Sequence, residues 1–239
     1  MSFIMESKLQ ELTDRVNAIR YRMENAAKGA GRALSEISLC AACKAQPSNI
    51  VRLSASLPVD LFGENRMQEM REHQMADAFL GKPCHFIGHL QTNKVRQVVG
   101  AVEVIQSVDR VRLVNAIQVE AARQKLVQEI LIEVNLGQED SKAGVHAQDL
   151  KPLMEAAAAC DNIRILGLMA IPPITQTEDE ARRYFANLRT LMEQAKTWQF
   201  GNAQLQVLSM GMTGSYEAAI KEGATIIRVG REIYGERVR

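Results

Sequence analysis

The chain has little of several features that mark specialised protein classes. Only four of its 239 residues are cysteine, too few for a disulfide framework in a chain of this length. Its apolar runs all fall short of the ~20 residues that a membrane-spanning helix needs. A formal net charge of +1 gives no electrostatic reason to expect nucleic acid or an anionic membrane as partner. We therefore expect a cytoplasmic protein without either partner.

Targeting and linker segments are also lacking. The N-terminal sequence MSFIMESKLQELTDR carries charges where a secretory signal would need an apolar segment. No stretch rich in proline, glycine or serine divides the chain, and no repeat or low-complexity segment is found. We expect a single domain over residues 1–239.

Short apolar runs alternate with helix-like segments along most of the chain. The runs are ISLCAAC, VDLFGEN, CHFIGHL, VEVIQSV, EILIEVN, IRILGLMAI, LQVLSMG and TIIRVG. Several are apolar on both faces, as parallel strands covered by helices should be. Helical spacing of apolar residues predicts an amphipathic helix over 5–29 and further helices over 66–79, 111–125, 147–159 and 178–198.

This alternation predicts an α/β fold, a (β/α)8 TIM barrel with an extra N-terminal helix. A doubly wound open sheet is the competing architecture. It would need a glycine fingerprint after the first strand, where AACKAQP has no glycine.

Cys40 and Cys43 form a CxxC pair, a spacing typical of redox and zinc sites. On a strand, however, residues three apart point to opposite faces. The two thiols therefore cannot converge on one metal ion, and we predict no metal site.

In such a barrel, function lies at the carboxyl ends of the strands. Lys44 ends the first apolar run, although lysine is rarely buried without a partner or a chemical role. Strand parity turns Lys44 inward with Cys40, and on the last strand Arg228 inward with Ile226. Because the first and eighth strands are neighbours in a closed barrel, both cations face one cavity. Such a pair needs an anionic or electron-rich ligand.

The loops after the seventh and eighth strands, SMGMTGS and GREIYG, occupy the usual phosphate site of this fold. Ser209 and Thr213 supply hydroxyl groups, and glycines such as Gly230 allow close backbone approach. Each loop alone reads as ordinary turn and capping sequence. Together, and near two inward cations, they favour a bound phosphate.

A lysine facing a phosphate site suggests Schiff-base chemistry. Pyridoxal phosphate and a phosphosugar bound by a class I aldolase are the two ligands that fit. Arg228 favours the first, because the pyridine nitrogen of pyridoxal phosphate needs a partner. An arginine keeps its proton, so it would donate to an unprotonated ring nitrogen and disfavour long-lived carbanion intermediates.

Over almost its whole length the chain resembles the pyridoxal phosphate homeostasis proteins. The motifs FGENRMQE, HFIGHLQTNK, EDSKAG, GLMAIP, LSMGM and IRVGREIYGER carry this resemblance. It implies a barrel similar to that of alanine racemase, holding pyridoxal phosphate without established turnover. The implied site comprises Lys44 as the aldimine lysine, Arg228 beside the pyridine nitrogen, Ser209, Thr213, Gly230 and Arg231 around the phosphate, Asn65 at the rim, and Lys142 near the entrance.

The sequence departs from the family's usual pattern at several positions. Cys43 and Thr213 stand where serines are usual, Arg66 and Cys84 replace aromatic residues, and Ser215 replaces an aspartate. Thr213 keeps a hydroxyl group, so phosphate binding should survive. The other changes bear on loop contacts and cofactor affinity.

Three functions remain open from the sequence: a monomeric cofactor-binding protein for vitamin B6 homeostasis, a weak amino-acid racemase and a phosphosugar aldolase. The first would bind pyridoxal phosphate and other B6 vitamers and would have apoenzymes that use the cofactor as partners. Racemases of the alanine racemase type need a base on each face of the substrate carbon, the second from an added β-domain. This sequence ends soon after the eighth strand, and Tyr234 is expected only to pack a short helix. We therefore expect no enzymatic turnover.

Overall fold

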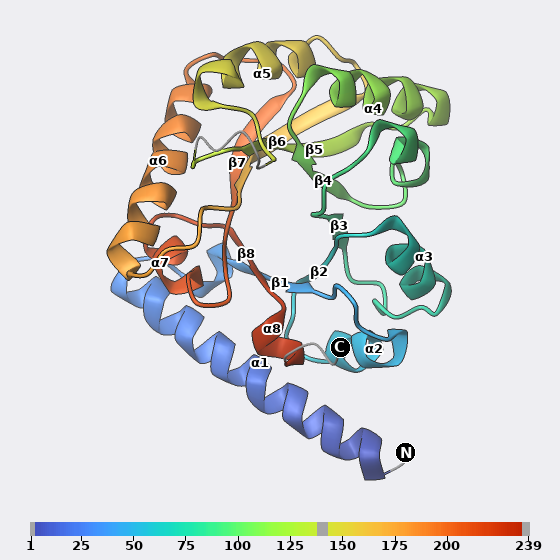
Figure 1. Cartoon of the computed structure of the whole chain (residues 1–239), viewed down its shortest axis with the longest axis vertical. Helices are drawn as coiled ribbons and strands as arrows, with labels where there is room; N and C mark the ends of the chain where they lie inside the picture. The colour runs from blue at the N-terminus through green and yellow to red at the C-terminus, as the bar shows by residue number, and fades with distance from the viewer. Residues whose placement is uncertain (1–2, 138–142, 236–239) are drawn as a thin grey trace.

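A computed structural model describes residues 3–137 and 143–235 of the chain (Figure 1). Within these ranges eight parallel strands form a closed barrel in which each strand pairs with its neighbours in sequence. Pairing of the last strand with the first closes the barrel. The predicted (β/α)8 barrel with an extra N-terminal helix is confirmed. None of the described helices combines the length and apolar character needed to cross a membrane.

The barrel strands and their covering helices follow the predicted alternation. The strands are β1 (Ser38–Ala42), β2 (Leu61–Glu64), β3 (Cys84–Phe86), β4 (Val104–Val108), β5 (Gln128–Val134), β6 (Ile163–Ala170), β7 (Ala203–Met212) and β8 (Ile226–Val229). The α-helices are α1 (Phe3–Gly29), α2 (Ser48–Ala55), α3 (Met67–Met75), α4 (Val111–Gln124), α5 (Leu150–Ala158), α6 (Glu178–Lys196), α7 (Tyr216–Lys221) and α8 (Arg231–Tyr234). Short 3₁₀ helices occur at η1 (Leu34–Glu36), η2 (Thr92–Gln97) and η3 (Ala147–Asp149).

Two connections differ from the expectation. The helix predicted over 66–79 ends at Met75, because Asp77 and Leu80 adopt positive φ angles of 48° and 51°, which an α-helix cannot accommodate. In the described residues β3 and β4 are joined by the 3₁₀ helix η2 in place of an α-helix.

Side chains of the strands divide into an outer and an inner set. The outward set, including Leu39, Ala41 and Cys43, joins the main apolar core between strands and helices. The inward set forms two small apolar clusters, one of which contains Cys40 and Ile226. The predicted parity of the first and last strands is confirmed.

Helix α1 lies outside the ring of covering helices and passes along α7 and α8 (Figure 1). Its side chains Leu12, Val16, Ile19 and Met23 recur at helical spacing and have 0% exposure. The predicted apolar face of this helix is confirmed, and it extends the core beneath β8 and β1.

Replacing Ile19 by alanine should destabilise the fold by about 2–5 kcal/mol, because it leaves a cavity under α1. Tyr21→Ala, at a side chain 67% exposed on the same helix, is the matched control and should change stability by less than about 0.5 kcal/mol. Urea unfolding measures both variants. Equal stability of the two would show that α1 is not part of the cooperative core.

Candidate functional site

Lys44 lies two residues beyond β1, in the turn that leads to α2. Its side chain is half-buried, and its amine makes no hydrogen bond or ion pair with any residue in the described ranges. The inward parity of β1 directs this turn toward the mouth of the barrel. An amine so placed is available to react with a ligand.

The turn around Lys44 is fixed to its neighbours. The backbone N–H of Ala45 donates to Glu69 Oε2 at 2.9 Å, and Ala45 itself adopts a left-handed φ of 59°. His73 Nε2 lies 2.9 Å from the carbonyl oxygen of Gln46 and donates to it. A left-handed non-glycine residue persists where surrounding contacts define it. The position of Lys44 is therefore set by α3.

Behind this turn lies a buried cluster of Cys43, Glu64 and His73. Cys43 Sγ donates to Glu64 Oε1 at 2.9 Å, and His73 Nδ1 lies 2.6 Å from the same oxygen. Burial disfavours the charged form of His73, but its hydrogen bond and ion pair with Glu64 outweigh this and raise its pKa. Burial and then Glu64 raise the pKa of Cys43 well above its usual value, so it remains a thiol.

Glu64 and His73 were not predicted from the sequence. Glu64 is on the helix-facing side of β2 with Phe62, and His73 follows Met70 by three residues on the buried face of α3. The signal in the sequence was that a carboxylate and an imidazole occupy positions of buried elements that are expected to be apolar. Each of these groups needs a partner when it is buried.

Arg228 anchors a second polar network, inside the barrel. Its Nη2 donates to the carbonyl oxygen of Ala170 at 2.9 Å, and its Nη1 donates to Ser209 Oγ at 2.5 Å. Ser209 in turn donates to Gln106 Oε1 at 2.6 Å, and Gln106 Nε2 donates to His85 Nδ1 at 2.8 Å. This chain of donors joins strands β8, β7, β4 and β3 across the interior.

The direction of the network fixes the state of His85. Because Gln106 donates to Nδ1, the imidazole is neutral and carries its proton on Nε2. Burial lowers the pKa of His85 to about 4, which agrees with this state. His85 is thus a hydrogen-bonded core residue, whereas His89 is exposed at the rim.

Five of the seven predicted site residues follow four adjacent strands, whereas Arg228 lies within β8 and Ser209 within β7. Asn65 follows β2, Thr213 follows β7, and Gly230 and Arg231 follow β8. A Cβ atom on Gly230 would lie 2.9 Å from the carbonyl oxygen of Ala42, so the loop after β8 lies directly against the end of β1. Thr213 and Arg231 are exposed at this rim.

The hydroxyl of Ser209 has no exposed surface and is engaged by Arg228 and Gln106. Its predicted contact with a phosphate therefore stays a prediction, and Thr213 is the accessible hydroxyl of this loop. Ser215, which replaces an aspartate of the family pattern, accepts from the N–H of Met212 at 3.2 Å and keeps the loop closed. Lys142 lies outside the described residues.

Glu133 is a further inward residue that sequence reasoning missed. It lies on β5 with 4% exposure. Burial, and then Asp109, raise its pKa to about 7, against the smaller effects of Arg228 and Arg110. The signal was present in EILIEVN, where parity turns Glu133 inward with Leu131. The barrel interior therefore holds a carboxyl group that changes its charge near neutral pH.

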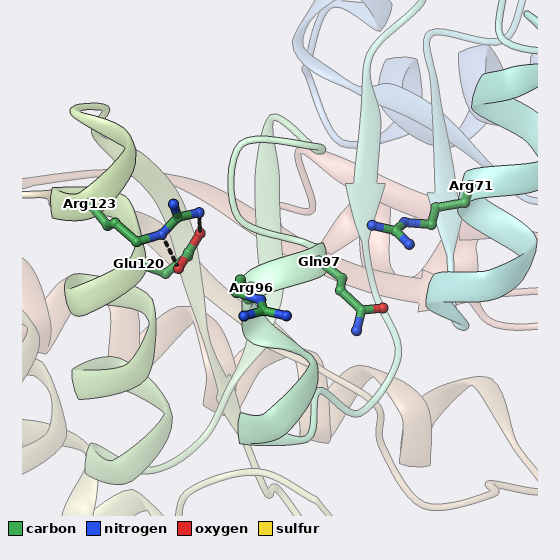
Figure 2. Close-up of a pocket in the computed structure, with 5 residues that line it drawn as sticks. All are labelled: Arg71, Arg96, Gln97, Glu120 and Arg123. Carbon is green, nitrogen blue, oxygen red and sulfur yellow. Dashed lines mark hydrogen bonds and ion pairs between the residues drawn. The ribbon is translucent and has the colours of Figure 1, made fainter.

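One cavity borders the rim, and another lies on the outer flank of the barrel. One of about 260 Å³ is lined by Asn65, His89 and Lys94 among others and borders the end of β2. The other, of about 550 Å³, lies among α3, η2 and α4 on the outer flank and is lined by Arg71, Arg96, Gln97, Glu120 and Arg123 (Figure 2). Arg123 is already paired with Glu120 there. The flank cavity includes none of the predicted site residues.

Tyr234 does not reach the rim. It is 6% exposed, and its hydroxyl lies 2.9 Å from Ser54 Oγ on α2. It packs α8 against α2, as predicted.

The barrel and its rim define the class of protein. The family pattern of the alanine racemase N-terminal domain matches residues 15–238. A pyridoxal phosphate homeostasis protein of Aquifex aeolicus is 40% identical over 94% of this chain and 97% of its own length. The chain belongs to the pyridoxal phosphate homeostasis protein family.

Two solved structures are similar throughout. An unknown protein from Bifidobacterium adolescentis has a TM-score of 0.89 and 32% identity, covering 95% of this chain and 96% of that one. PipY of Synechococcus elongatus, solved with pyridoxal phosphate bound, has a TM-score of 0.82 and 29% identity, covering 94% and 100% of the two chains. The sequence-based resemblance is confirmed.

The pKa of Glu133 predicts a pH-dependent stability. The carboxyl group titrates near its ordinary 4.5 when unfolded but at about 7 when folded, so stability should fall as pH rises between these values. The loss should reach ~3 kcal/mol. Glu133→Gln mimics the protonated acid and should abolish this part of the pH dependence.

Urea unfolding of both proteins across this pH range measures the difference. Curves that run parallel at every pH would show that Glu133 has an ordinary pKa in the folded barrel.

Proposed function

We propose that this chain is a pyridoxal phosphate-binding protein of vitamin B6 homeostasis, in which residues 1–239 act as one cofactor-binding domain. One observation carries the proposal. The amine of Lys44, which has no hydrogen bond or ion pair among the described residues, follows β1, and the buried cation Arg228 lies on the adjacent strand β8. The names of the relatives and the cofactor bound to PipY support it.

Arg228 supports the identity of the ligand. The guanidinium is 4% exposed, and it has no carboxylate ion-pair partner among the described residues. Its Nε–H is not used in the bonds to Ser209 and Ala170. A buried cation with a spare donor suits a neutral acceptor such as an unprotonated pyridine nitrogen. Arg228 would then hold the ring without protonating it.

The other residues divide the remaining work. Lys44 would form an imine with the aldehyde carbon of the cofactor and release one water molecule. The exposed hydroxyl of Thr213 and the backbone N–H groups of Gly230 and Arg231 would bind the phosphate, with Ser209 steadying Arg228 from below. Asn65 would close the edge next to β2. When bound, pyridoxal phosphate supplies an electron-accepting ring conjugated to this imine.

The proposed protein has no turnover of its own. Tyr234 is buried against α2, and His85 is neutral within the interior network. Neither can act as a second base above a substrate. We propose that the protein acts as a monomer in the cytoplasm. It would bind and release pyridoxal phosphate and other B6 vitamers and deliver the cofactor to apoenzymes that use it.

One observation favours the alternative, a weak amino-acid racemase. Glu133 is an inward carboxyl group whose pKa of about 7 suits proton transfer near neutral pH. It would supply the second acid or base that the tyrosine does not.

The visible absorption spectrum tests the cofactor proposal. Protein mixed with pyridoxal phosphate should show the band of a protein-bound imine, and Lys44→Ala should abolish it because the imine is proposed to form on this amine. Lys94→Ala, a lysine that lines the neighbouring cavity, is the matched control and should keep the band. Loss of the band in Lys94→Ala alone would contradict the assignment.

Exchange of the α-proton of L-alanine and L-serine in deuterated water separates the two functions. We expect no exchange at enzyme-like rates with the wild-type protein. Exchange that requires Lys44 and is lost in Glu133→Gln would instead establish the racemase, with Glu133 as its second base.

A further inference from the structure

The buried cluster of Cys43, Glu64 and His73 combines three side chains that ligate metal ions. They come from the end of β1, from β2 and from α3, and their ligand atoms all lie within 4.8 Å of one another. Exposure is 0% for Cys43 and Glu64 and 2% for His73. We propose that this cluster is a structural zinc site.

The donor set selects the metal. A thiol, an imidazole and a carboxylate are together typical of zinc, which binds sulfur, nitrogen and oxygen ligands tetrahedrally. Calcium and magnesium prefer oxygen ligands alone, and here one side chain supplies oxygen. Cys43 supplies the soft ligand of the set.

The hydrogen bond on the far side of His73 has the arrangement of a metal ligand. A ligating histidine usually donates its second ring N–H to a carbonyl or carboxylate, which fixes the nitrogen that faces the metal. His73 Nε2 donates to the carbonyl oxygen of Gln46 at 2.9 Å, and this leaves Nδ1 directed at Glu64. Loss of the proton on Nδ1 would therefore leave the tautomer that zinc requires.

Charge and geometry both permit the exchange of protons for zinc. The cluster with a thiol, a carboxylate and an imidazolium is neutral overall. Loss of the protons on Cys43 Sγ and His73 Nδ1 and gain of Zn²⁺ leave it neutral, so burial imposes no net charge. Ligand atoms around a tetrahedral zinc ion lie about 3.3–3.7 Å apart, because the bonds to zinc are ~2.0–2.3 Å long. Cys43 Sγ and His73 Nδ1 would therefore each move away from Glu64 Oε1 by less than ~1 Å.

One atom of the cluster has no role in the hydrogen-bonded arrangement. Glu64 Oε2 is buried and has no hydrogen-bond partner. Such an orphaned acceptor is rare in native proteins and often indicates an ion or water at the site. A zinc ion bound to Glu64 would supply the partner that this oxygen lacks.

Zinc here would tie the turn carrying Lys44 to β2 and α3, beneath the rim. The site does not depend on pyridoxal phosphate, because no ligand atom reaches the barrel interior. It is therefore tested on cofactor-free, tag-free full-length protein, by elemental analysis after zinc loading during refolding and by the visible spectrum after loading with cobalt(II).

We expect one zinc per chain and the d–d absorption of tetrahedral, thiolate-bound cobalt. Cys43→Ser keeps a donor to Glu64 but should weaken zinc binding by at least about a hundredfold, since loss of a supporting residue alone costs 10–100-fold. His73→Lys keeps a cation beside Glu64 and should also lose the metal. Cys84→Ser, at a buried thiol outside the cluster, should retain it.

Absence of zinc from the loaded wild-type protein would overturn the proposal and leave a hydrogen-bonded acid and base. Zinc retained equally in Cys43→Ser and His73→Lys would overturn it as well, since the ion would then lie elsewhere. Both results can be measured whether or not the protein binds pyridoxal phosphate. A failure of the zinc proposal is therefore distinct from a failure of the proposed function.

Discussion

Closure of the barrel by pairing of β8 with β1 is the constraint on which the site depends. The register sets Cys40 opposite Arg228 and Ala41 opposite Val229, and the loop that starts at Gly230 then lies against Ala42. Residues almost two hundred positions apart thus meet at one rim. A side chain at Gly230 would push this loop away from β1, so the glycine that follows β8 keeps the rim compact.

The barrel interior is built in two chemically different parts. Small apolar clusters around Cys40 and Met169 fill one part, and the network from Arg228 to His85 fills the other. A buried polar network is stable when its members are satisfied, and here Arg228, Ser209 and Gln106 each donate to an acceptor within the interior. The cost of burying Arg228 is offset in this way, while its Nε–H remains for a ligand.

Periodicity predicted the strands, the apolar face of α1 and the inward direction of Lys44 and Arg228, because these follow from local spacing alone. It could not predict partners contributed by distant elements. Ser209 was assigned to phosphate binding from its loop, yet Gln106 on β4 and Arg228 engage its hydroxyl. Likewise strand parity places Cys40 and Cys43 on opposite faces, as predicted, but only the fold brings Glu64 and His73 to Cys43.

The assignment of Lys44 is tested most directly by reducing the protein with borohydride in the presence of pyridoxal phosphate and mapping the labelled peptide by mass spectrometry. The account predicts a single pyridoxyl group on the peptide that contains Lys44. A label confined to another lysine, such as Lys94 at the neighbouring cavity, or no label at all, would contradict it.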